Sequence, residues 1–447
     1  MLKNKLKHGL TSRHILMIAL GSAIGTGFFF GSGGSIKLAG PAILLSYSIG
    51  GIMMYIIVRA LGEMAVAEPS SGSFSYYAYK YIGNYAGFVS GWNYWFNYII
   101  VCMLELTATG IFMDYWFPQS VHWIITLVVI VLFTGINLLN VRMFGEFEFW
   151  FAGIKVVTVI CLVLFGLYIL GFGNNHQQSV SNVSNLWQNG GFFANGLQGF
   201  LFSFVVVVFS FGGTELVGIT AAEAENPRKT IPMAINGIIV RILLFYIATL
   251  AIIMCLYPWN KIDSHISPFV DVFQQIGIAK AASLMNLVAI TAALSSLNSG
   301  IYGTARMVYN LGLQGNAPQA MTKVSAKGSP MNAIIFSIIC IGLTVFLNYL
   351  YPKQIFNILL SIATIAAIIN WITILVTHIN FKRKFTGISH YPIFFYPLSS
   401  VIAIIFLVMV AGIMYFMPDF RLAIIIAPIW LCLLSIGYLI KTKIMGK

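Results

Sequence analysis

The chain has 447 residues, of which 59% are hydrophobic and only 8% are charged. Soluble domains carry about 25% charged residues, so the composition excludes a soluble globular protein and indicates one polytopic membrane domain. The net charge of +13 does not indicate nucleic-acid binding, because the basic residues lie in short segments between apolar runs. The five cysteines have no metal-binding spacing, so neither a metal nor a cofactor is expected.

Transmembrane helices need about 20 consecutive apolar residues. By this criterion the sequence predicts an all-α integral membrane protein. Its twelve predicted spans are 15–33, 40–62, 84–114, 121–140, 149–172, 196–220, 234–257, 279–308, 331–350, 354–379, 394–416 and 420–440.

The distribution of basic residues predicts the orientation of these spans. With the N-terminus inside, one lysine of the 25 Lys and Arg residues, Lys155, lies within a span, and most of the others lie on the inside or at its margin. The five that fall outside are Lys37, Lys261, Lys280, Lys353 and Arg421. Because cytoplasmic loops are rich in Lys and Arg, we expect residues 1–14 and 441–447 to be cytoplasmic.

The first span is interrupted at its middle by Gly21-Ser22-Ala23-Ile24-Gly25-Thr26-Gly27. Every backbone polar group in hydrocarbon needs a partner, so a broken helix is tolerated there only where it lines a cavity within the protein. The alternative is a continuous helix whose glycines permit close packing against a neighbour.

Two charged residues lie deep within spans three and five. Glu105 is near the middle of the run from Gly91 to Phe112, and a carboxylate at that depth usually faces the interior of the bundle. Lys155 either extends to the inner headgroups or lies buried, where an ammonium gives up its proton more readily, and the sequence leaves both alternatives open. The aromatic residues before Glu105 are typical of an interfacial belt: Trp92, Tyr94, Trp95 and Tyr98.

The sixth span carries a second interruption, in which Ser210-x-x-Gly213-Thr214 repeats the pattern Ser22-x-x-Gly25-Thr26 of the first. The carboxylate of Glu215 follows directly. Glycine-interrupted spans at corresponding positions of two halves indicate a transporter binding site near the bilayer midplane. We therefore predict that both spans are unwound, near Ala23–Gly27 and near Ser210–Gly213.

The eighth span contains Ser295-Ser296-Leu297-Asn298-Ser299-Gly300. Small polar residues within a span often serve close helix packing, so a site role for Ser295 or Asn298 is one of two alternatives here.

Five motifs, in family order, make the chain resemble the amino-acid permeases of the amino acid–polyamine–organocation superfamily. They are Gly21-Ser22-Ala23-Ile24-Gly25-Thr26-Gly27, Arg59-Ala60-Leu61-Gly62-Glu63-Met64, Gly145-Glu146-Phe147-Glu148-Phe149-Trp150, Phe209-Ser210-Phe211-Gly212-Gly213-Thr214-Glu215 and Glu223-Ala224-Glu225-Asn226-Pro227. Within the bacterial amino-acid transporter branch, the chain is similar to proline-type permeases, near the γ-aminobutyrate, aromatic and histidine permeases.

The resemblance implies a five-plus-five inverted-repeat fold of the LeuT type. Its repeats would be 15–172 and 196–379, with two additional helices in 394–440. Amides of the first break would hold the substrate carboxylate, and carbonyls of the second would accept from its ammonium. The implied substrate-binding residues are Ala23, Ile24, Gly25, Thr26, Gly27, Glu105, Phe209, Ser210, Phe211, Gly212, Ser295 and Asn298. Lys155, where some relatives have a lysine in place of a sodium ion, and Glu215 are the implied proton-coupling residues.

The leading hypothesis is a secondary active transporter of the bacterial inner membrane. It would import an amino acid, with proline or another neutral one favoured, by proton-coupled alternating access, so its partners are the amino acid, protons and the lipid bilayer. An exchanger would use the same site without obligatory proton movement, and an amino-acid sensor would bind without much transport. An enzyme is not expected, because the sequence has no nucleophile–base constellation.

Overall fold

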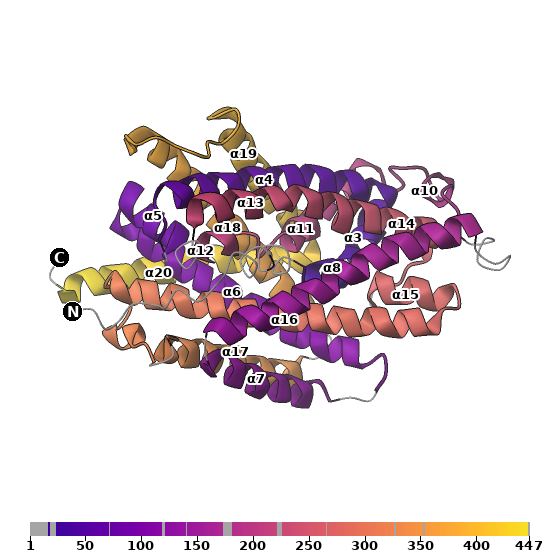
Figure 1. The fold of residues 1–447 in the computed structure, drawn as a ribbon, viewed down its shortest axis with the longest axis horizontal. Helices are drawn as coiled ribbons and strands as arrows, with labels where there is room; N and C mark the ends of the chain where they lie inside the picture. The colour runs from indigo at the N-terminus through magenta and orange to yellow at the C-terminus, as the bar shows by residue number, and fades with distance from the viewer. Residues whose placement is uncertain are drawn as a thin grey trace.

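The computed structural model describes Met17 and residues 24–70, 72–118, 121–139, 141–172, 181–220, 226–264, 266–325, 328–351 and 354–445. Over these ranges all regular elements are helical and none is a strand, which confirms the predicted all-α fold. Most of the long helices run along the longest axis of the molecule (Figure 1).

Twenty-two helical segments occur in the described ranges, and each predicted span overlaps at least one of them. In chain order they are α2 (Thr26–Phe29), α3 (Gly31–Ala39), η1 (Gly40–Ala42), α4 (Ile43–Ala67), α5 (Ser73–Tyr81), α6 (Asn84–Met113), α7 (His122–Leu139), α8 (Val141–Phe172), α10 (Asn185–Gln188), α11 (Gly196–Ser210), α12 (Leu216–Thr220), α13 (Pro227–Arg241), η3 (Ile242–Ala248), α14 (Thr249–Leu256), η4 (Trp259–Lys261), α15 (Pro268–Gln275), α16 (Ala279–Leu313), η5 (Gln319–Thr322), α17 (Met331–Leu350), α18 (Ile355–Lys384), α19 (Leu398–Phe416) and α20 (Pro418–Met445).

Nine helical stretches of the described residues are long and apolar enough to cross a bilayer, and two shorter apolar helices lie at His122–Leu138 and Gly196–Ser210. One stretch, Gly31–Ala67, joins parts of two predicted spans, so the total of twelve spans remains a prediction. The repeat boundaries also remain predictions. Several helices extend past the apolar segment, as α8 does by beginning at Val141, because helical hydrogen bonding continues beyond the hydrocarbon.

The sixth span is broken, as predicted. Helix α11 ends at Ser210, the next five residues form turns, and α12 begins at Leu216. Gly213 has φ +97°, a conformation that residues with a β-carbon rarely adopt. In the first span, Ile24 and Gly25 are not helical and α2 begins at Thr26, while Ala23 lies outside the described residues.

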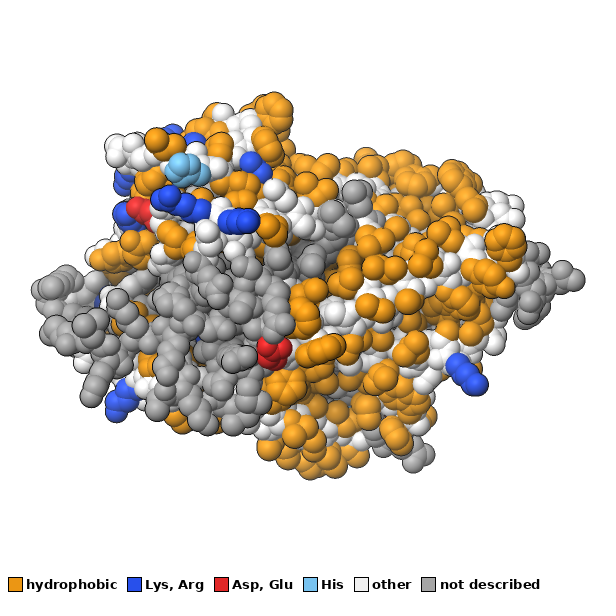
Figure 2. Space-filling model, in the orientation of Figure 1, with side chains coloured by type: hydrophobic (Ala, Val, Ile, Leu, Met, Phe, Trp, Pro, Cys, Tyr) orange, Lys and Arg blue, Asp and Glu red, His pale blue; other side chains and the backbone are white. Residues whose placement is uncertain are grey.

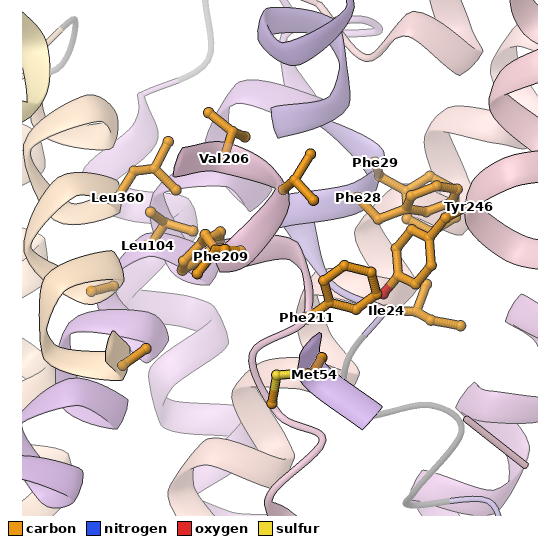
Figure 3. Packing of buried hydrophobic residues seen from close by; sticks show 14 of the residues in the cluster. Ile24, Phe28, Phe29, Met54, Leu104, Val206, Phe209, Phe211, Tyr246 and Leu360 are labelled. Atoms are coloured by element: carbon orange, nitrogen blue, oxygen red, sulfur yellow. The ribbon is translucent and has the colours of Figure 1, made fainter. Parts of the chain in front are cut away.

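Tyr246, in the π-helical segment η3, holds the two broken segments together. Its hydroxyl donates to the Ser210 carbonyl at 2.9 Å, which supplies a partner to a backbone group where α11 ends. Its ring lies edge-on to Phe28 of α2, with centroids 5.1 Å apart, and 4.8 Å from Phe211 of the second break. Figure 3 shows this cluster, in which Phe211 points toward Tyr246 and Phe209 points to the other side of the segment.

The surface fits a membrane protein. Hydrophobic side chains cover much of the described part of the face seen in Figure 2, and many large apolar residues are exposed, such as Trp150, Ile339 and Phe416. Lys and Arg side chains in this view gather mainly toward one end of the long axis. An apolar band with a basic end is the pattern that lipid and the positive-inside rule require.

A buried carboxylate anchors the segment between α18 and α19. Glu63 of α4 accepts from His378 and Lys382 of α18, each at 2.9 Å. It also accepts from the Ser389 hydroxyl at 2.6 Å and from the Ile393 amide at 2.9 Å. The predicted second span ends at residue 62, just before Glu63, but α4 continues through it to Ala67. This carboxylate therefore ties two helices and a loop together.

We expect Glu63→Ala to destabilise the fold by about 3–5 kcal/mol, because it leaves buried donors without their acceptor. Lys80→Ala is the control. Lys80 pairs with Glu68 at 2.5 Å but is 41% exposed, and exposed pairs contribute at most about 1 kcal/mol. Thermal unfolding in detergent measures both variants, and equal shifts would show that the Glu63 cluster is not a stabilising anchor.

Candidate functional site

A small cavity lies where the two breaks meet α6, α16 and α18. Its lining is Gly25, Gly27, Asn97, Tyr98, Val101, Glu105, Phe209, Ser210, Gly212, Gly213, Glu215, Leu216, Ser296, Ser299, Ala363 and Ala367. Residues from both predicted breaks therefore face one space. The remaining lining comes from three long helices that cross them.

The start of α2 borders this cavity through Gly25 and Gly27. A β-carbon on Gly25 would lie 2.5 Å from Glu105 Oε1, and one on Gly27 would lie 2.9 Å from the Phe209 ring and 3.1 Å from the Ser210 Cα. Only a residue without a side chain fits at such contacts. Glu105 therefore approaches the backbone closely at Gly25, and the second break approaches it closely at Gly27.

The amide of Thr26 already has an acceptor. It donates to the Glu105 carboxylate, at 3.4 Å to Oε1 and 3.3 Å to Oε2, and both residues are buried. An anion at the first amide of a helix is favourable. Glu105 therefore lies where the resemblance places the carboxylate of the substrate, which the sequence did not indicate.

The second break is joined to the first through Ser210. Its hydroxyl lies 2.8 Å from the Gly27 carbonyl, 3.0 Å from the Val206 carbonyl and 3.1 Å from the Tyr47 hydroxyl, which donates to it. Phe209, Ser210 and Gly212 line the cavity, as the prediction requires. Phe211 does not line it and instead packs on Tyr47 and Tyr246. Ile24 is likewise packed in the core.

Glu215 lies at the cavity wall with two donors from other helices. The Tyr98 hydroxyl donates to Oε1 at 3.0 Å, and the Trp371 indole nitrogen donates to Oε2 at 3.4 Å. The expectation of an interfacial belt is wrong for Tyr98 and Tyr94, which are 4% and 0% exposed. Their α6 positions face the bundle interior, where the polar tip of a tyrosine needs a partner.

Lys155, Ser295 and Asn298 do not line the cavity but form a second buried cluster beside it. Lys155 is fully buried, so the alternative that it extends to the headgroups is wrong. Its ammonium donates to the Ser295 hydroxyl at 2.8 Å, and that hydroxyl donates to Glu148 Oε1 at 2.5 Å. Asn298 donates to Glu148 Oε2 at 3.4 Å and accepts from Asn137 at 2.9 Å. Ser295 and Asn298 therefore both lie in the contact between helices and take part in a buried polar cluster.

Several lining residues and Glu148 were missed by the sequence predictions, although helical spacing pointed to them. Asn97 and Val101 precede Glu105 by two turns and one turn of the same helix, so the three share a face. Glu148 precedes Lys155 by seven residues, which also places both on one face of α8. Ala363 and Ala367 are four residues apart on α18, but nothing in their chemistry marks them.

The amino acid permease family model matches residues 14–445 of the chain. The chain belongs to the amino acid permease family. Among similar proteins, the aromatic amino acid transport protein AroP of Escherichia coli K12 is 46% identical over 442 residues, which cover 98% of this chain and 96% of AroP. AroP of Salmonella typhimurium LT2 is 45% identical over the same number of residues, with the same coverage.

Membership in the amino acid permease family makes this protein a transporter of amino acids rather than an enzyme. It confirms the resemblance to the amino acid–polyamine–organocation superfamily and the LeuT-type class of fold. A multi-pass permease of this family has an amino acid as its substrate and the membrane as its environment. The cavity between the two breaks is accordingly the candidate substrate site of this permease.

Proposed function

We propose that this permease imports an aromatic amino acid across the bacterial inner membrane by alternating access, in symport with protons. One observation carries the proposal: a single cavity is bounded by both broken helices and by two buried carboxylates, Glu105 and Glu215. The names of the AroP relatives favour an aromatic substrate. The preference for proline expected from the resemblance remains a prediction, which the same uptake panel tests.

In the proposed binding mode, the substrate carboxylate faces the amides at the start of α2. The substrate ammonium faces the carbonyls of the second break, at Phe209, Ser210 and Gly212. The substrate side chain faces Val101, Ala363 and Ala367, the small apolar residues of the cavity lining. Phe209 covers the cavity beside Gly27.

Glu105 supports coupling to protons. Its carboxylate accepts a hydrogen bond from the Thr26 amide. The carboxylate of Glu105 and that of the substrate are therefore two anions that compete for one donor. Like charges in a buried site repel, and one of the two is favoured to take up a proton. Substrate and proton would thus enter together. Lys155, buried on α8, is the second proposed coupling group, and Glu215, at the cavity wall, is the third.

The proposed orientation places both termini in the cytoplasm, because most basic residues then lie inside. The test of the function is uptake into proteoliposomes with a panel of twenty amino acids and γ-aminobutyrate, with and without an imposed pH gradient. Accumulation of aromatic amino acids under an inward proton gradient supports the proposal. Uptake only against preloaded amino acid, with no response to pH, would show an exchanger instead.

We expect Ala367→Leu to weaken competition by aromatic amino acids about tenfold, because three added carbons fill the space proposed for the ring. Competition by proline and alanine, which need less room, should weaken about threefold or less. Competition against a labelled substrate in proteoliposomes measures both effects. An equal loss for large and small amino acids would place the ring elsewhere in the cavity.

A further inference from the structure

The buried cluster on α8 contains a carboxylate that the proposed coupling does not yet use. Glu148 and Lys155 both have side chains with 0% exposure. They are seven residues apart, which is about 10.5 Å along a helix and places them on nearly the same face. Both therefore face α16, which packs against α8.

Ser295 of α16 lies between these two charged groups. It accepts from Lys155 Nζ at 2.8 Å and donates to Glu148 Oε1 at 2.5 Å. The second distance is that of a short, charge-assisted bond between a hydroxyl and a carboxylate. A hydroxyl that accepts from a cation and donates to an anion connects the two by one continuous proton path.

The cluster is separated from the substrate cavity only by the thickness of one helix. Ser295 and Asn298 of α16 face Glu148, whereas Ser296 and Ser299 of the same helix line the cavity. Lys155 in the cluster and Glu105 at the cavity are both buried and carry opposite charges. A change of charge in the cluster is therefore felt at the cavity, because buried charges are weakly screened.

We propose that Glu148 is the proton acceptor of Lys155 and that Ser295 relays the proton between them. This inference rests on the proposed proton coupling. In the step, an N–H bond of Lys155 breaks as an O–H bond to Ser295 forms, and the original hydroxyl proton passes to Glu148 Oε1. The products are a neutral amine, a carboxylic acid and an unchanged serine.

The relay gives Lys155 a way to release its positive charge without sending a proton through lipid. The net charge of the pair stays the same during the internal step, and it rises by one when a proton arrives from the aqueous side. Asn298 and Asn137 hold the second oxygen of Glu148 in place. Among the described residues, Glu105 of α6 is a further charged group that acts on Lys155, and Glu146, two residues before Glu148 on α8, is half-buried.

The decisive variant is Glu148→Gln, which keeps the shape and hydrogen-bonding capacity of the side chain but cannot accept the proton. We expect proton-driven accumulation to fall about tenfold or more, while substrate affinity at one pH changes less than about threefold. The pH dependence of substrate affinity, measured by scintillation proximity in detergent, should become flatter. Size-exclusion profiles and melting temperatures establish that the variant is folded.

Ser295 provides an independent test of the relay. Ser295→Ala removes the hydroxyl and should slow proton-driven uptake about tenfold, whereas Ser295→Thr retains a hydroxyl and should restore most of the rate. Thr291→Ala is the matched control, because its hydroxyl donates to Val288 of its own helix one turn away. The double variant Glu148→Gln with Lys155→Ala should be no worse than Lys155→Ala alone.

The outcomes separate this inference from the proposed function. If uptake by the wild-type protein does not respond to a proton gradient, the proposed proton coupling is overturned. The inference is then overturned too, unless Glu148→Gln still flattens the pH dependence of substrate affinity. Wild-type protein that is proton-driven, together with a Glu148→Gln variant that is driven equally, overturns the inference alone. A loss in Ser295→Ala that Ser295→Thr does not rescue assigns Ser295 to packing and removes the relay.

Discussion

Gly27→Ala is expected to weaken substrate binding at least about tenfold, although it adds only one methyl group. The added β-carbon would lie 2.9 Å from the Phe209 ring and 3.1 Å from the Cα atom of Ser210. The ring can turn, but the backbone contact can be relieved only by moving α2 away from the second break. Such a shift also stretches the bond from the Ser210 hydroxyl to the Gly27 carbonyl, which is 2.8 Å long.

Gly27→Ala should lower substrate affinity while the protein remains folded. Overpacking of one methyl group costs typically about 1–3 kcal/mol, which a protein of this size tolerates. Gly34→Ala on α3 is the control, because nothing lies within 4 Å of its added β-carbon. Calorimetry or scintillation proximity measures affinity for both variants. Unchanged affinity in Gly27→Ala would show that the substrate does not approach the backbone at this break.

Gly25→Val extends the same comparison to the other glycine. Its β-carbon would displace Glu105, whose Oε1 lies 2.5 Å away, and would also meet Ser296 at 3.1 Å. The carboxylate is the free end of a flexible side chain, so it yields more easily than backbone. Substitutions at the two glycines are therefore expected to act differently. A side chain at Gly27 changes the distance between the breaks, whereas one at Gly25 changes the position of Glu105.

The breaks were predictable from sequence because their cause is local. Glycines and small hydroxyl residues within an apolar run permit a break in the helix, and the Ser-x-x-Gly-Thr pattern repeated in the two halves indicated where the breaks lie. Gly50-Gly51 of α4, which lack that pattern, remain helical. The burial of Glu105 and Glu215 followed from the cost of a charge in lipid. Even so, the partner of the Thr26 amide was not predictable, because Glu105 is 79 residues away in the chain.

The parts that were missed depend on which face of a long helix meets which neighbour. Tyr98 was assigned to the interface because tyrosine is common there, yet its hydroxyl bonds Glu215, which lies 117 residues away in the turn between α11 and α12. Phe211 was among the site residues that the resemblance implied, but the turn at the second break directs it toward Tyr246. The type of a residue indicates how deep it lies in the membrane. The direction in which its side chain points depends on how the helices pack, which the sequence does not show.

Lys155→Arg is expected to lose proton-driven accumulation, down to the level of protein-free liposomes, while substrate still binds. Arginine keeps the positive charge but cannot release its proton within a protein. Its wider planar head also cannot reproduce the 2.8 Å bond that the lysine ammonium makes to Ser295. Lys155→Ala removes the charge altogether and should separate uptake from pH in the same way.

The measurement is uptake into liposomes with imposed proton or sodium gradients, with Lys80→Arg, at a partly exposed position, as the control. Accumulation driven by sodium, without a response to protons, would contradict proton coupling, because a fixed ammonium repels a cation and offers no oxygen ligand. Normal proton-driven uptake by Lys155→Ala would keep the coupling but remove Lys155 from it. The proton would then be carried at the cavity itself, by Glu105 on the Thr26 amide or by Glu215 beneath Tyr98.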